Sequence, residues 1–169
     1  MELDELARSL RRAHLVSPDA SEALEIDADG VERMLRHRPP MRLVDALDRW
    51  DRASRSLRGR RTVAPEDPVL AGHFPGEPVY PGVLQLEMMG QLGLCLGWLE
   101  ARERGDDAPM DGRLLKIHHA TFLDAVRPGD RLTIEARAVD DNPLTAVVAS
   151  QAWRDESLCA TCVMEIYFA

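Results

Sequence analysis

The sequence predicts an α+β domain in which one long helix packs against an antiparallel sheet. Residues 83–104 are apolar on nearly every side for about four turns, which is the pattern of a helix buried by packing. Four strand-like stretches follow the helix, near 113–122, 130–139, 144–154 and 158–168. RPGD and DDNP turns separate these strands, as is typical of an antiparallel meander.

Two short helices are expected near the start of the chain. Residues 3–15 carry leucine and alanine at helical spacing among charged residues, which predicts an amphipathic helix. SPDASEA at 17–23 is rich in residues that break helices and predicts a linker. Residues 28–36 predict a second short helix, which Pro39 and Pro40 stop.

A hairpin and a loop connect these helices to the long one. Residues 41–50 and 52–64 alternate roughly between apolar and polar side chains, and we expect them to form the two strands of the hairpin. The stretch 65–82 holds five of the eleven prolines, so we expect a rigid irregular loop. Gly105 marks the end of the long helix.

The composition is that of one globular domain. The 169 residues carry a net charge of −8, so we expect no nucleic acid partner, because there is no basic excess to neutralise phosphates. Cys159 and Cys162 form a CxxC, but no second pair supports a zinc site, so we expect no metal. The first residues lack the apolar core of a signal peptide, and the run 83–99 contains polar residues that make it marginal for a bilayer. We therefore expect a cytoplasmic protein without membrane insertion.

The stretch 71–91, AGHFPGEPVYPGVLQLEMMGQ, contains the residues best suited to chemistry. His73 lies in a loop rich in glycine and proline, and Glu87 lies in an otherwise apolar helix, where an isolated carboxylate costs several kcal/mol to bury. Gln91 is one turn later on the same face, whereas Gln85 is off that face and is expected to be partly exposed. A structural Glu–Gln pair is one explanation of this pattern, and a catalytic acid is the other.

The catalytic interpretation uses each part of the stretch. Pro81–Gly82 leads into the helix, whose first backbone N–H groups suit a carbonyl oxygen that becomes negative. An apolar setting favours a protonated Glu87 as a proton donor, and a neutral imidazole at His73 supplies a base. Acid, base and oxyanion donor are what the removal of water beta to a carbonyl requires. Three other histidines are expected to be surface or structural residues: His37, His118 and His119.

Three segments of the chain together resemble one known family. HFPGEPVYPGVLQLE (73–87) is similar to the signature of the FabZ-type 3-hydroxyacyl-acyl-carrier-protein dehydratases, in which a loop histidine in HFPG precedes PGV and a helical glutamate. HRPPMRLVD (37–45) resembles the family's HRxPxxLVD segment, and LKIHHATFLDAVRPGD (115–130) resembles its pattern of a strand, a phenylalanine and PGD. The likeness covers about residues 26–168. A glutamate at position 87 resembles the FabZ branch, whereas the isomerising FabA branch carries aspartate.

The resemblance implies a hot-dog fold over residues 26–169, with an antiparallel sheet wrapped around a long central helix and a helical extension at 1–25. It implies reversible dehydration of a (3R)-3-hydroxyacyl thioester to the trans-2-enoyl thioester, in fatty acid or specialised polyketide or lipid biosynthesis. It also implies an obligate homodimer, in some members a trimer of dimers, whose sites combine a histidine from one subunit with a glutamate from the other. The phosphopantetheine arm of an acyl carrier protein would present the substrate, without a metal or redox cofactor.

The same resemblance implies roles for individual residues. His73 is expected to take the C2 proton, Glu87 to protonate the departing C3 hydroxyl, and the Gly82 N–H to polarise the thioester carbonyl. Gln91 is expected to orient Glu87. The remaining candidates shape the loop or line the acyl tunnel: Pro75 and Gly76 for the loop, and Phe74, Val83, Leu86 and Met89 for the tunnel.

The extension at 1–25 departs from the usual start of the family. It carries Arg8, Arg11 and Arg12 among its apolar residues. We expect a solvated amphipathic cap, and contact with a neighbouring surface or partner is the alternative.

The segment after Phe122 also departs from the family pattern. The family places basic residues there, whereas this chain has Leu123 and Asp124, and only Arg127 remains. Carrier proteins are acidic, so the thin basic rim indicates a carrier or synthase domain of a specialised pathway, docked through other arginines. The candidates are Arg38, Arg42 and Arg113.

Three alternative functions stay open at this point. A hot-dog thioesterase also binds acyl thioesters but hydrolyses them, and a hydratase acts on coenzyme A thioesters. A non-catalytic hot-dog subunit would bind acyl chains or partners, and it would have no need of His73 or Glu87.

Overall fold

Seven antiparallel strands form a single sheet in the computed structural model, which describes residues 3–168. The strands are β1 (Glu22–Ile26), β2 (Ala46–Asp51), β3 (Ser56–Thr62), β4 (Gly112–Phe122), β5 (Arg131–Asp141), β6 (Thr145–Arg154) and β7 (Ser157–Phe168). Their order across the sheet is β1-β2-β3-β5-β6-β7-β4. The meander predicted for the second half holds for β5, β6 and β7, but β4 pairs with β7 at the far edge. Local turn signals cannot reveal such a crossing, because pairing between distant strands is decided by packing.

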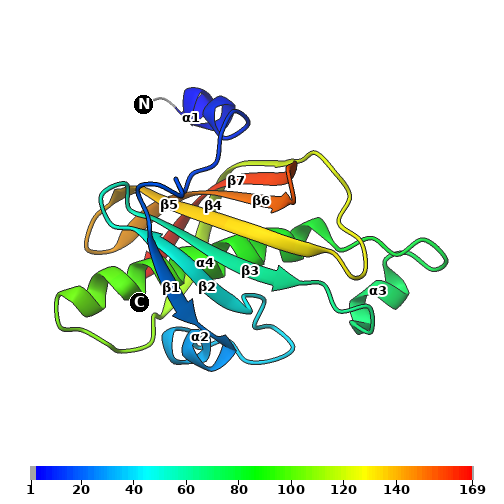
Figure 1. Cartoon of the computed structure of the whole chain (residues 1–169), viewed down its shortest axis with the longest axis horizontal. Coiled ribbons are helices and arrows are strands. Elements are labelled where there is room, and N and C mark those ends of the chain that lie inside the picture. The colour runs from blue at the N-terminus through cyan, green and yellow to red at the C-terminus, as the bar shows by residue number, and fades with distance from the viewer. Residues whose placement is uncertain (1–2, 169) are drawn as a thin grey trace.

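One long helix covers one face of this sheet (Figure 1). The helices are α1 (Leu3–Ser9), α2 (Ala28–Met34), α3 (Pro68–Gly72) and α4 (Gly82–Glu103). Alternate residues of β5, namely Leu132, Ile134 and Ala136, belong to the main core between the sheet and α4. The predicted α+β arrangement of an antiparallel sheet against a long helix is therefore confirmed. In the described part of the chain, no helix is both long and apolar enough to cross a bilayer.

α4 is buried on all sides only in its middle. The residues from Gln91 to Leu96 are all buried, whereas Val83 is 71% exposed and Glu87 is partly exposed. The prediction of burial on every side is thus wrong for the first turns, which leave one apolar face open. Gln85, expected to be partly exposed, is buried, because its Nε2 points under the preceding loop and donates to the carbonyl oxygen of Tyr80 at 3.4 Å.

The N-terminal segment lies on the outer face of the sheet, opposite α4 (Figure 1). α1 ends at Ser9 instead of continuing to residue 15 as predicted. Leu6 of α1 and Leu10 and Leu15 after it pack into a second small core with β6 and β7, and the arginines of the segment are exposed, as expected of an amphipathic cap. Residues 22 and 23, predicted as part of a linker, begin β1 and pair with β2. An edge strand depends on its neighbour for pairing, which explains why its own sequence carried little signal.

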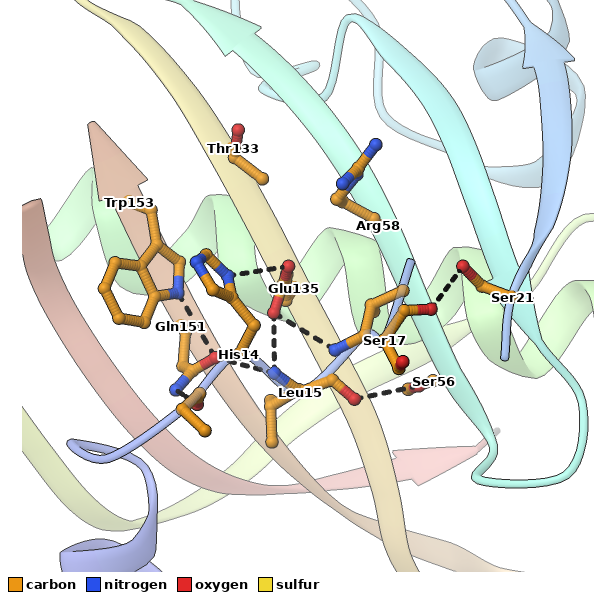
Figure 2. Close-up of polar contacts among 12 residues, drawn as sticks. His14, Leu15, Ser17, Ser21, Ser56, Arg58, Thr133, Glu135, Gln151 and Trp153 are labelled. Atoms are coloured by element: carbon orange, nitrogen blue, oxygen red, sulfur yellow. Dashed lines mark hydrogen bonds and ion pairs between the residues drawn. The ribbon is translucent and has the colours of Figure 1, made fainter. Parts of the chain in front are cut away.

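Two buried polar side chains anchor this segment to the sheet (Figure 2). Glu135 of β5 is 1% exposed, and its Oε2 accepts hydrogen bonds from the N–H groups of Leu15 at 2.7 Å and Val16 at 3.2 Å. Its Oε1 lies 3.0 Å from Nδ1 of His14. Gln151 of β6 donates to two backbone carbonyls of the same segment. The segment is therefore held by hydrogen bonds to its backbone, which do not depend on its side chains.

Candidate active site

His73 stands at the end of α3 in a loop that closes on itself. Its Nδ1 lies 2.8 Å from the carbonyl oxygen of Val79, and the N–H of Val79 donates back to the carbonyl of His73 at 2.8 Å. A carbonyl oxygen can only accept, so Nδ1 carries the hydrogen. In the neutral ring, Nε2 is therefore unprotonated and free to act as a base.

The loop beyond His73 is tight and mostly exposed. Gly76 has a φ of +82°, in the left-handed region that favours glycine, and the N–H of Glu77 donates to the carbonyl of Phe74 at 3.1 Å. The Phe74 ring stacks on the His73 ring, with centroids 4.1 Å apart. Pro75 is exposed, and Phe74 and Gly76 border a hollow on the other side of the loop. These three residues thus form the loop that holds His73. None of them lines the cavity beside His73, so Phe74, expected in the acyl tunnel, lies outside it.

The N-terminus of α4 presents backbone donors close to His73. No side chain caps this helix, and the N–H groups of Leu84 and Gln85 donate to the carbonyl of Pro81. The first helical N–H groups, at Gly82 and Val83, have no hydrogen-bond partner within the described residues. They suit an oxygen that gains negative charge.

Two cavities meet at this end of α4. One of about 470 Å³ is lined by His73, Gly82 and Phe122. The other, of about 260 Å³, is lined by Leu86, Glu87 and Gln91 as well as apolar residues of β4 and β7. Val83 borders both. Within one chain the structure therefore brings His73 and Gly82 together in one cavity and Glu87 and Gln91 in the next.

Glu87 is held by two side chains. Nε2 of Gln91, one turn later, donates to its Oε1 at 2.8 Å, as the spacing on the helix predicted. Nε2 of His37 lies 3.2 Å from the same oxygen. The carboxyl side chain is 35% exposed, so its polar end reaches the cavity.

His37 is a neighbour of Glu87 that sequence reasoning did not place there. It was expected to be a surface or structural histidine, yet it lines the same cavity as Glu87. The two residues are far apart in the chain, and only packing of the loop after α2 against α4 brings them together. The HRPP segment was the available signal, since it held a histidine in a constrained loop. Met89, expected in the acyl tunnel, is fully buried in the main core and borders neither cavity.

The cysteines do not form a reactive or metal-binding site. Among the residues that the structure describes, no group of histidine, cysteine and carboxylate side chains is placed to hold a metal ion. Burial raises the pKa of the Cys162 thiol to about 12, so this side chain stays a neutral thiol at physiological pH.

A family model described as a FabA-like domain matches residues 35–162. The chain belongs to this family. The chain is 35% identical to the 3-hydroxyacyl-[acyl-carrier-protein] dehydratase FabZ of Aliarcobacter butzleri over 137 residues. The aligned part makes up 80% of this chain and 92% of that relative. A relative of the same name from Nitratiruptor is 33% identical over 137 residues, with the same coverage.

Solved structures show the same fold at lower sequence identity. The dehydratase heterocomplex ApeI:P from Xenorhabdus doucetiae has a TM-score of 0.70 at 20% identity, over 82% of this chain and 90% of that one. A mutant thioesterase from Pseudomonas aeruginosa has a TM-score of 0.55 at 16% identity, over 100% of this chain and 94% of that one. The fold is therefore the hot-dog fold, as predicted, and this fold serves more than one chemistry.

Proposed function

We propose that this protein is a 3-hydroxyacyl-acyl-carrier-protein dehydratase. It converts a (3R)-3-hydroxyacyl thioester reversibly to the trans-2-enoyl thioester and water. The observation that carries the proposal is the tautomer of His73, which leaves Nε2 bare on a side chain that lines the same cavity as Gly82 and Val83 at the start of α4. A family relationship to FabZ dehydratases over most of the chain supports it.

The proposed reaction assigns one task to each group. Nε2 of His73 takes the C2 proton while the thioester carbonyl oxygen accepts from the Gly82 N–H. The C2–H electron pair forms the C2–C3 double bond, and the C3–O bond breaks. Glu87 protonates the departing hydroxyl, which leaves as water. His73 is then protonated and Glu87 ionised, so a proton must pass from His73 to Glu87, through solvent, before the next turnover. Dehydration involves no net oxidation or reduction, so the step needs no redox cofactor.

A second copy of the chain would complete the site. β4 is an edge strand, and it exposes several large apolar side chains: Leu114, Leu115, Ile117 and Phe122. An exposed apolar edge of this length is normally covered. Leu114 and Ile117 also border the Glu87 cavity, so a partner paired along β4 would lie beside that carboxylate. We propose a two-fold homodimer in which His73 of one subunit serves Glu87 of the other.

The proposed substrate carrier is an acyl carrier protein. The basic residue expected near the site, Arg127, lies 3.9 Å from Glu77, and Arg154 pairs with Asp124 at 2.5 Å. Both positive charges are thus partly neutralised beside the His73 cavity, which supports docking through arginines elsewhere on the surface.

The test is an assay with a short (3R)-3-hydroxyacyl thioester of pantetheine. Enoyl-thioester absorbance and free thiol are followed together for the wild type, His73→Ala and Glu87→Gln. We expect enoyl formation in the wild type and a loss of about 10²- to 10⁴-fold in each variant, the usual contribution of a general acid or base. Free thiol without enoyl product would instead identify a thioesterase. A comparison of coenzyme A with carrier-bound substrate then identifies the preferred carrier.

A further inference from the structure

The contact between His37 and Glu87 joins the loop after α2 to α4. The proposed reaction gives His37 no task. Within the described residues that border the Glu87 cavity, His37 and Glu87 are the only titratable side chains, and Gln91 is the only other polar one. All other contacts in this cavity are to glycine or apolar residues. The orientation of the Glu87 carboxyl therefore depends on His37 and Gln91.

We propose that His37 is a positioning residue that fixes which oxygen of Glu87 delivers the proton. The inference rests on the proposed function. Gln91 Nε2–H donates to Oε1 at 2.8 Å, and Nε2 of His37 lies 3.2 Å from the same oxygen. With the His37 N–H directed there as well, Oε1 is the carbonyl-type oxygen of the protonated carboxyl. Oε2 then carries the proton that goes to the leaving hydroxyl.

The orientation of Gln91 is set by the backbone. Its Oε1 accepts from the N–H of Leu43 at 2.8 Å, and its Nε2 donates to the carbonyl of Met41 at 2.7 Å. A backbone N–H can only donate and a carbonyl can only accept, so the amide cannot be turned round. The nitrogen facing Glu87 is therefore a donor.

The tautomer of His37 follows from its other nitrogen. Nδ1 is buried and has no hydrogen-bond partner within the described residues. A buried N–H without a partner is rarer in proteins than a buried acceptor without one. The hydrogen is therefore on Nε2, the atom 3.2 Å from Oε1 of Glu87.

The backbone around His37 is restrained. Nη1 of Arg38 donates to the carbonyl of Leu35 at 2.9 Å and to that of His37 at 2.8 Å. The residues that follow, Met41 and Leu43, are the ones bonded to Gln91. Loop and helix thus form one unit that holds the imidazole against Glu87.

Two donors on Oε1 have a chemical consequence. After Oε2 gives up its proton, the negative charge on the carboxylate is stabilised by the Gln91 hydrogen bond and by the His37 N–H beside the same oxygen. The hydroxyl group leaves as water, the C2–C3 double bond forms, and no further proton is needed. His37 changes the rate of this step through Glu87, without contact with substrate.

The test compares His37→Leu, which removes the donor, with His37→Gln, whose Nε2–H can reach the same place. His14→Leu is the matched control, because Nδ1 of His14 lies 3.0 Å from Glu135 on the opposite face of the sheet. We expect His37→Leu to lower kcat about 10- to 100-fold, the value of a hydrogen bond to a charged group, with KM within about twofold. His37→Gln should recover most of kcat, and the control should match the wild type. Equal kcat in all variants, or a Gln variant as slow as the Leu variant, would overturn the proposal.

Crystal structures of the wild type and both His37 variants provide a readout that needs no turnover. We expect the Glu87 carboxyl to keep its orientation in His37→Gln and to rotate in His37→Leu. An unchanged carboxyl in His37→Leu contradicts the inference even if the wild type is a dehydratase. A wild type inactive on every thioester would reject the proposed function alone, and the carboxyl orientation would still decide the role of His37.

Discussion

Two histidines of this chain are assigned opposite tautomers: that of His73 by the carbonyl oxygen beside Nδ1, and that of His37 by the absence of a partner for its buried Nδ1 within the described residues. His73 gives its Nδ1–H to the carbonyl of Val79, which leaves Nε2 free to take a proton. His37 directs Nε2 to Glu87, and its buried Nδ1 is left bare. The same side chain can thus serve as a base or as a fixed donor, because its environment decides which nitrogen is protonated.

The backbone conformation of Gly76, in the loop that carries His73, can be tested by substitution. Gly76 has a φ of +82°, so Gly76→Ala should cost about 1 kcal/mol of folding free energy and lower kcat, since the loop carries His73. Gly72 precedes the same histidine, but an added Cβ there meets nothing within 4 Å. Gly72→Ala should therefore change stability by less than about 0.5 kcal/mol. Urea unfolding of both variants measures the difference, and equal costs would contradict the strain at Gly76.

Sequence reasoning at the residue scale found the residues of one contiguous motif and missed the distant one. His73, Gly82, Glu87 and Gln91 lie within one stretch whose helical spacing predicts the contact between Gln91 and Glu87. His37 depends on the packing of a loop, for which no local pattern exists. The roles expected of all these residues remain predictions until the variants are assayed.

At the scale of elements, the N-terminal segment is held on the outer face of the sheet by hydrogen bonds and apolar contacts. Glu135 and Gln151 bond to its backbone (Figure 2). Leu6, Leu10 and Leu15 pack against residues of β6 and β7. The sequence predicted its amphipathic character but not its attachment, because Glu135 in a strand gives no sign of what it will meet. In contrast, α4 was predicted to within one residue at each end, since a long periodic helix with a glycine after it carries its own boundaries.

The attachment of the N-terminal segment to Glu135 predicts that two Glu–His pairs differ in their contribution to stability. Glu135→Gln keeps one oxygen for the Leu15 and Val16 N–H groups, but it replaces a charged acceptor with a neutral one and puts an NH₂ group where Oε1 faced His14. It should cost about 1–3 kcal/mol. Glu165 lies 3.3 Å from His118 but is 24% exposed, so Glu165→Gln should cost less than about 1 kcal/mol. Urea unfolding measures both, with hydrogen exchange at residues 15 and 16 as the local readout. A Glu135→Gln protein with wild-type stability and protection would show that the buried carboxylate does not hold the segment.

For the whole molecule, β4 and the start of α4 form one exposed apolar surface. β4 exposes apolar side chains at the edge of the sheet, and the first turns of α4 expose Val83 beside the same strand. Both surfaces border the Glu87 cavity. The exposed face of α4, which the sequence alone suggested was buried, is explained if a second copy of the chain covers it.

This arrangement predicts the effect of a charge placed on the β4 edge. Leu115 of β4 is 59% exposed, and Leu144 in the turn between β5 and β6 is 60% exposed. Leu115→Lys should weaken the homodimer about tenfold or more, because it places a charge in the proposed interface, and activity should fall with it. Leu144→Lys should leave both unchanged. Sedimentation at several protein concentrations measures the dimer, and identical behaviour of the two variants would argue against pairing through β4.

The most direct test of a shared active site is complementation between two inactive variants. His73→Ala and Glu87→Gln are purified separately, mixed under conditions that exchange subunits, and assayed for enoyl-thioester formation. If His73 of one subunit works with Glu87 of the other, each mixed dimer regains one intact site, and random pairing restores about a quarter of wild-type activity. A mixture that stays as inactive as its components, although mixed dimers form, would contradict the account.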